Sequence, residues 1–226
     1  MNKKEYSETI ENIIKAMLLA IEANYLLNVK LIEPKYAENG SLINKTDINE
    51  QNKEIKKAIS TIWLANSNVM KEAYKQVIDT NFVYYNAVKE RLGKPVYTRT
   101  EINAMINDIV KVRSDAVKIK QVISGNANVF NNRLQKQIKE MYIDGATKKD
   151  IQKAIKKQFG LNTRRAKTIA TTEVNYYKSS AQLEATKGLA VKKIWRHKRA
   201  REPRETHVAA DGQVVYGHDA MFVVGG

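Results

Sequence analysis

Apolar residues in the first part of the chain recur every three or four positions, which is the spacing of one face of an α-helix. The first series predicts an amphipathic helix over about residues 5–29, which ends before Pro34. A second series predicts a longer helix over about residues 47–92. The LGKP segment at 92–95 ends it, because glycine favours a helix C-terminus and proline restricts the residue before it.

Two further helices are predicted in the middle of the chain. Thr100 can cap a helix that runs to a stop at Gly125, and another helix is expected over residues 129–142. Alternating charges on long helices are typical of a bundle, or of an arm that docks on a partner. We therefore expect residues 1–125 to form a helical N-terminal region.

The pattern in the second half predicts a basic helical hairpin. Thr147 and Asp150 have the spacing of a capping box, and Gly160 follows the apolar positions of a first helix. A second helix is predicted over about residues 163–187, with Gly188 as its stop. Its buried face should consist of Ala166, Ile169, Ala170, Val174, Tyr177 and Ala181.

Short apolar segments follow the second of these helices. VKKIW at 191–195, QVVY at 213–216 and AMFVV at 220–224 are predicted to form a small β-sheet on which the hairpin packs. The fold class is therefore α+β: a mostly helical N-terminal arm or bundle, then a small domain over residues 126–226.

The apolar face of the first predicted helix must be buried away from solvent. Ile10, Ile14, Met17, Leu18 and Ile21 must pack against a second surface, which is either the helix at 47–92 or another protein. The aromatic residues Trp63, Tyr84 and Tyr85 leave a similar choice between core residues and interface anchors, and burial statistics favour the core.

Composition excludes several classes of protein. The chain has 226 residues and no cysteine, which excludes disulfide frameworks, thiolate metal sites and cysteine nucleophiles. No apolar run approaches the length of a membrane span, so we expect a soluble protein without membrane contact.

The formal net charge of +15 is concentrated in one part of the chain. Residues 1–50 are slightly acidic, whereas residues 151–200 contain only two acidic residues, Glu173 and Glu184, among many lysines and arginines. Such a field attracts phosphate chains without regard to sequence, although a basic helix can also be a solvated face. The candidate contacts to double-stranded DNA are Lys148, Lys149, Lys153, Lys156, Lys157, Arg164, Arg165 and Lys167.

The turn of the predicted hairpin offers a second way to contact DNA. FGLNTRRAKTI is similar to a helix-hairpin-helix turn, in which backbone N–H groups at a helix start face a phosphate. Gly160 is present, and Asn162 stands where that turn has a second glycine.

Several separated motifs resemble one family of phage proteins. They are the step Ala170, Thr171, Thr172 and Glu173, then Trp195, then Arg204 with His207, and the turn Asp211, Gly212 and Gln213. Over roughly residues 128–226 the chain resembles the C-terminal domain of the phage Mu F-type head morphogenesis proteins, the minor head proteins of tailed phages. Thr171 stands where the family usually has arginine, Pro203 interrupts the segment before Arg204, and a cysteine-containing tail is lacking.

The resemblance implies a non-enzymatic virion component without a cofactor. Such a protein is made in the host cytoplasm, binds the portal protein at the portal vertex inside the capsid, and assists head assembly and genome packaging and ejection. The scaffold or major capsid protein is a further expected partner, and the N-terminal region is the candidate for docking on the portal. The alternatives are a metal-dependent nuclease and the delivery module of a phage-associated toxin.

Two interpretations of the C-terminal histidines remain open. His207, Asp211, His218 and Asp219 could form a metal site, which would suit a nuclease. The spacing matches no zinc or nuclease motif, and nearby arginines would repel a metal, so we expect no metal and no catalytic residue. In the structural interpretation, which we favour, Glu173, Arg204 and His207 form a buried polar network under Trp195, and Asp211 and Gly212 form a tight turn.

Overall fold

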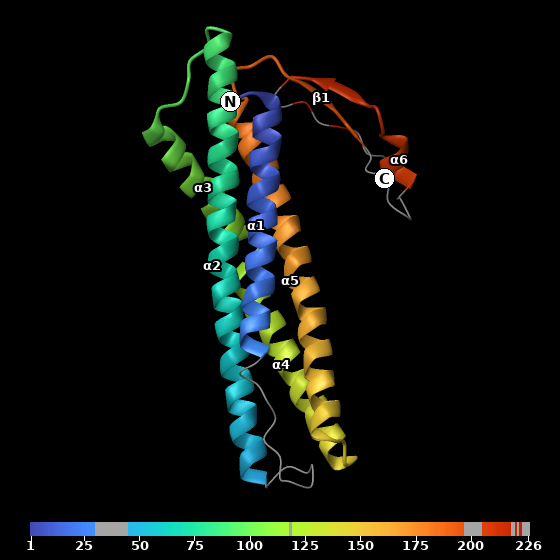
Figure 1. Ribbon diagram of the computed structural model, residues 1–226. Helices are drawn as coiled ribbons and strands as arrows, with labels where there is room; N and C mark the ends of the chain where they lie inside the picture. The colour runs from blue at the N-terminus through green and yellow to red at the C-terminus, as the bar shows by residue number, and fades with distance from the viewer. Residues whose placement is uncertain (30–44, 118, 197–204, 218–219, 221, 223–226) are drawn as a thin grey trace.

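The computed structural model describes residues 1–29, 45–117, 119–196, 205–217, 220 and 222 (Figure 1). These residues form a mostly helical protein with one small antiparallel sheet. The helices are α1 (Lys3–Val29), α2 (Lys45–Arg91), α3 (Arg99–Val117), α4 (Ile119–Ile143), α5 (Lys148–Ala185) and α6 (Glu205–Ala209), and the strands are β1 (Lys192–Ile194) and β2 (Val214–Tyr216).

Helices α1, α2 and α5 lie side by side along an elongated bundle, and α3 and α4 pack against α2 and α5 (Figure 1). The apolar stripe of α1 faces this bundle: Ile10, Met17 and Ile21 are almost completely buried. Trp63 is a core residue as expected, and Tyr84 and Tyr85 pack partly buried against the core. The sequence left open whether the helix at 47–92 or another protein covers this stripe. In the structure, α2 and α5 of the same chain cover it.

The predicted bounds of α1 and α2 are confirmed to within a few residues, but the predicted stop at Gly125 is wrong. Gly125 lies inside α4, so the expected boundary between residues 125 and 126 falls within a helix. A glycine inside a helix costs about 1 kcal/mol relative to alanine. The buried residues Phe130, Leu134 and Ile138 on the same helix outweigh that cost.

The predicted basic hairpin is wrong as well, because α5 is one unbroken helix of 38 residues. Gly160 and Asn162 both lie inside it, which removes the helix-hairpin-helix interpretation. One buried stripe continues through the expected turn with spacings of three and four, and it holds the helix together. It comprises Ile151, Ile155, Phe159, Asn162, Ala166, Ala170, Val174, Tyr177, Ala181 and Ala185.

The capping box at the start of α5 is confirmed. Thr147 is the N-cap, its hydroxyl accepts a hydrogen bond from the backbone N–H of Asp150, and the Asp150 carboxylate accepts one from the backbone N–H of Thr147. The exchange satisfies two backbone donors that would otherwise have no partner in the first turn. The capping box therefore fixes the start of α5 at Lys148, directly after Thr147.

Strands β1 and β2 pair antiparallel in the register Lys192 to Tyr216 and Ile194 to Val214. The predicted turn before β2 is present, and Gly212 has a φ of 82°, a conformation that favours glycine. The third strand expected over residues 220–224 falls mostly outside the described residues. Among the elements that the structure describes, the strand pair contacts none of α1 to α5 and lies beside the bundle in Figure 1, so the expected packing of helices on a sheet is wrong.

Candidate nucleic-acid interface

The basic residues in the first half of α5 form an exposed face. The buried stripe occupies the opposite side of this helix, so lysines and arginines three, four or seven positions apart point to solvent together. We call the exposed basic residues of this segment the α5 basic face: Lys149, Lys153, Lys156, Lys157, Arg164 and Arg165. The structure does not describe the side chain of Lys148. From Lys149 to Arg165 the face is about 24 Å long at 1.5 Å per residue.

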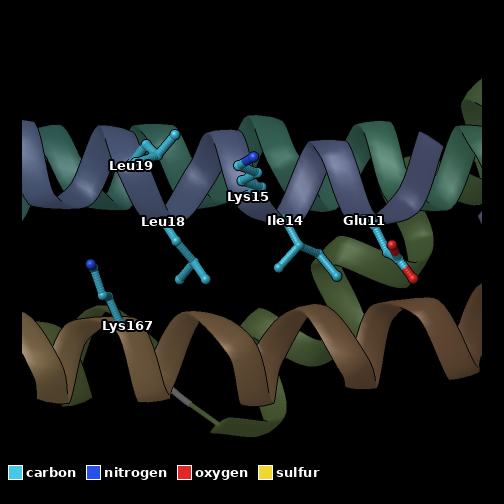
Figure 2. A pocket seen from close by; sticks show the side chains of 6 residues that line it. All are labelled: Glu11, Ile14, Lys15, Leu18, Leu19 and Lys167. Atoms are coloured by element: carbon cyan, nitrogen blue, oxygen red, sulfur yellow. The ribbon is translucent and has the colours of Figure 1, made fainter. Parts of the chain in front are cut away.

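Lys167 belongs to a different environment from the rest of the predicted DNA contacts. It is half-buried, and its Nζ lies 2.6 Å from Oε2 of Glu22 on α1. It also borders a shallow groove of about 300 Å³ between α1 and α5, where Ile14 and Leu18 point from α1 toward α5 (Figure 2). Lys167 therefore joins α1 to α5, and its charge is already compensated.

Asp150 is the acidic residue within the α5 basic face. Hydrogen bonds from the hydroxyl and backbone N–H of Thr147 lower the pKa of its carboxyl group, and Lys153 and Lys149 lower it further. The carboxylate therefore stays ionised at neutral pH, where it serves the helix start and offsets one of the surrounding positive charges.

Glu173 has a partner that the sequence did not reveal. Its two carboxylate oxygens accept hydrogen bonds from Nε and Nη2 of Arg113 on α3, at 2.9 and 2.8 Å. The guanidinium carbon of Arg113 also lies 4.0 Å from the centre of the Tyr176 ring. The glutamate side chain is 9% exposed and the arginine side chain 21%. These hydrogen bonds raise the pKa of Arg113 above its usual value, so the pair is ionic.

The Arg113–Glu173 pair differs from the network predicted for Glu173. Arg204 lies outside the described residues, and the structure does not describe the side chain of His207, whereas Arg113 holds both oxygens of the glutamate. A signal for Arg113 was present in the sequence. It follows Ile102, Ile106 and Ile109 at the spacing of the buried face of α3, where a positive charge requires an acidic partner.

Buried tyrosines surround this ion pair. The ring of Tyr74 on α2 stacks on that of Tyr177 on α5, with 4.6 Å between ring centres. Burial, and after it the neighbouring charge of Glu173, raises the pKa of Tyr177 to about 12, while Arg113 opposes the shift. The cluster joins α2, α3 and α5, so its evident role is to hold three helices together.

Trp195, Asp211 and Gly212 lie close together at the end of the strand pair. The backbone N–H of Gly212 donates to the carbonyl of Trp195 at 3.0 Å, and the N–H of Trp195 donates to the carbonyl of Gln213 at 2.9 Å. The Trp195 ring meets the ring of Phe222 edge to face, with 5.5 Å between centres. These motif residues therefore stabilise the turn and the hairpin, while Glu173 belongs to the bundle.

The metal hypothesis falls largely outside the described part of the chain. His218 and Asp219 are not described, and neither is the side chain of His207. Within the described ranges there is no group of three or more histidine or acidic side chains arranged to hold a metal ion. None of the helices described here has an apolar stretch long enough to cross a bilayer.

Comparison with known proteins gives a match to a family model. Residues 132–225 match the family model described as Phage Mu protein F like protein, which covers somewhat less than half of the chain. No curated protein and no solved structure matches the chain significantly. The matched region begins inside α4 and includes α5, the strand pair and the turn at Gly212.

Proposed function

We propose that this chain is a minor head protein, because residues 132–225 match the model of the Phage Mu protein F like family, a family of structural phage head proteins. It acts at the portal vertex inside the capsid, where it assists head assembly and the packaging and ejection of the genome. The family match carries this proposal. The role is non-catalytic, since the motif residues Trp195 and Gly212 take part in a turn and Glu173 in an ion pair.

The location is tested on particles. The protein should be present in purified procapsids and virions, and it should co-sediment with purified portal protein. Its absence from both kinds of particle would contradict a head role. Presence in the particle without portal binding would retain the head role and contradict the portal partner.

The proposal includes sequence-independent contact with double-stranded DNA through the α5 basic face. Six exposed basic side chains spread over the solvent-facing half of a rigid helix offer charges along its length to a phosphate backbone. If each contacts one phosphate, the logarithm of the association constant should fall with the logarithm of salt concentration with a slope of about −5. The affinity should therefore fall steeply between low and moderate salt.

Two matched triple variants test this contact. The variant K153E/K156E/K157E reverses three charges of the α5 basic face, and K53E/K56E/K57E reverses three exposed lysines of α2 at the same spacing. Both change the net charge equally, and both sets of lysines lie on the surface of a helix. We expect the α5 variant to lose most of its affinity for duplex DNA and the α2 variant to lose much less. Adding R164E and R165E to the α5 variant should abolish binding.

Equal loss of DNA affinity in the two triple variants would show that net charge, and not the α5 basic face, governs binding.

A separate assay addresses catalysis: the protein is incubated with DNA and Mg²⁺, Mn²⁺ or Zn²⁺. Cleavage that disappears in a folded His207→Ala or Asp211→Asn variant would contradict the non-catalytic role and support the nuclease alternative.

A further inference from the structure

The two faces of the strand pair differ in what covers them. Lys193 and Val215 point to one side, where Nζ of Lys193 donates to the carbonyl of Ala220 at 2.8 Å. Trp195 and Phe222 also pack together at this end of the pair. Ala220 and Phe222 therefore lie against this face of the hairpin.

The opposite face is open to solvent. Alternation along the strands places Lys192 and Ile194 of β1 beside Tyr216 and Val214 of β2. The exposed fractions are 39% for Ile194, 38% for Val214 and 72% for Tyr216. We call these four residues the open hairpin face. None of α1 to α5, in the described residues, packs on it.

The open hairpin face combines an exposed aromatic ring with positive charge. Nζ of Lys192 lies 6.0 Å from the centre of the Tyr216 ring, and the exposed Arg196 follows shortly after β1. The sequence around β1 is strongly basic, and Glu202 is its only acidic residue between positions 187 and 204. The basic residues of that segment are Lys187, Lys192, Lys193, Arg196, Lys198, Arg199, Arg201 and Arg204.

We propose that the open hairpin face binds single-stranded DNA, with the Tyr216 ring stacked on a base and Lys192 and Arg196 contacting phosphates. Flat aromatic side chains beside cations are the usual elements of sites that bind single strands without sequence preference. Every base has a face that can stack, whereas in a duplex both faces of an internal base are already stacked. The ring of Tyr216 therefore distinguishes a single strand from a duplex.

The charge of the region selects this occupant over a protein. A protein partner would be expected to meet a largely apolar face with few charges at its centre. Here the apolar pair Ile194 and Val214 is small, and cations lie next to the aromatic ring. The polar side-chain groups of this face are the Tyr216 hydroxyl and the Lys192 ammonium, and the comparison of oligo-dT with oligo-U described below tests DNA against RNA as the ligand.

This site is separate from the α5 basic face, and the inference does not depend on the head role. The experiment uses the full chain carrying K153E/K156E/K157E/R164E/R165E, which removes the duplex contact proposed for α5. Fluorescence anisotropy then compares a labelled oligo-dT, an oligo-U and a duplex of equal length. We expect oligo-dT to bind, the duplex to bind at least tenfold more weakly, and oligo-U to bind no more tightly than oligo-dT.

Substitutions at Tyr216 separate stacking from burial. Tyr216→Phe keeps the flat ring and should retain the affinity for oligo-dT, whereas Tyr216→Leu and Tyr216→Ala should lose at least about fivefold. Lys192→Gln with Arg196→Gln should also weaken binding and reduce its salt dependence, whereas Lys53→Gln on α2 should leave both unchanged. The exposure of Tyr216 allows all three substitutions without unfolding, and thermal unfolding checks this.

Several results would overturn the inference. These are no measurable binding of oligo-dT, equal binding of duplex and oligo-dT, tighter binding of oligo-U, or unchanged affinity in Tyr216→Ala. Retention of full affinity in Tyr216→Leu would mean that an apolar side chain suffices, which would replace base stacking with a hydrophobic contact of the kind that a protein partner makes.

Discussion

The ion pair between Arg113 and Glu173 allows a quantitative test of how α3 is held against α5. Substitution of Arg113 by methionine keeps much of the side-chain volume and leaves the Glu173 carboxylate buried without its partner. Removing one member of a fully buried pair costs about 3–5 kcal/mol. Because the Arg113 side chain is 21% exposed, water can reach part of the site, so we expect a loss of about 2–4 kcal/mol.

Two independent contributions support this magnitude. Two charged hydrogen bonds at 2.9 and 2.8 Å are lost, and each contributes about 1.5–3 kcal/mol before the compensating solvation of the carboxylate. The contact of the guanidinium with the Tyr176 ring contributes about 0.5–1 kcal/mol more. The substitution should therefore lower the urea midpoint by about 1 M, for an m-value of about 3 kcal/mol/M.

A double-mutant cycle measures the pair itself. We expect Arg113→Met with Glu173→Leu to be more stable than Arg113→Met alone, because an apolar pair leaves no buried charge. The control is Lys4→Ala, which removes an exposed pair with Glu8 at 3.8 Å and should cost less than about 0.5 kcal/mol. A coupling energy below about 0.5 kcal/mol for Arg113 and Glu173 would refute the argument that this pair joins α3 to α5.

Three further outcomes follow from the fold. Gly160→Ala should stabilise the protein by about 0.5–1 kcal/mol, because the glycine lies in a helix with open space around it. Gly188→Ala should destabilise the protein by about 1–2 kcal/mol, because Gly188 has a φ of +79°. Destabilisation by Gly160→Ala in urea unfolding would contradict the unbroken helix. Burial raises the pKa of Tyr6 and of Tyr177 from 10.0 to about 12, so the folded state favours the neutral rings. The contribution of these two tyrosines to the free energy of unfolding should be complete below pH 10 and be lost as the pH rises through 12. A thermal unfolding midpoint that does not change over this window would contradict the burial. Deletion of residues 1–29 should abolish cooperative thermal unfolding, because it exposes the core residues of α2 and α5. Deletion of residues 205–226 should leave the helical bundle as stable as before. Thermal unfolding of each variant, followed by circular dichroism, distinguishes the two results.

Periodicity predicted those parts of the fold that depend on one face of a helix. The bounds of α1 and α2, the buried residues of α5 and the capping box at Thr147 all follow from local spacing. The apolar stripe of α1 predicted burial correctly, although spacing alone could not identify the surface that covers it.

The errors arose where tertiary packing outweighs a local signal. Glycine favours the end of a helix by only about 1 kcal/mol, and a continuous buried stripe outweighs that preference at both Gly125 and Gly160. The sequence placed Arg113 on a buried helix face, where it needs an acidic partner, but it did not identify Glu173 as that partner, because the two are 60 residues apart and meet only through the packing of α3 on α5. The α5 basic face could be predicted as exposed, whereas its contact with DNA stays a prediction.

The length of α2 affects how the protein behaves in solution. A straight helix of 47 residues extends for about 70 Å, whereas a compact domain of 226 residues, with a radius of gyration of about 17 Å, would be a sphere only about 45 Å across. A particle built around such a helix diffuses more slowly than a sphere of the same mass. A single copy should therefore elute early from a size-exclusion column, at the position of a heavier globular protein, and light scattering is needed to give its true mass.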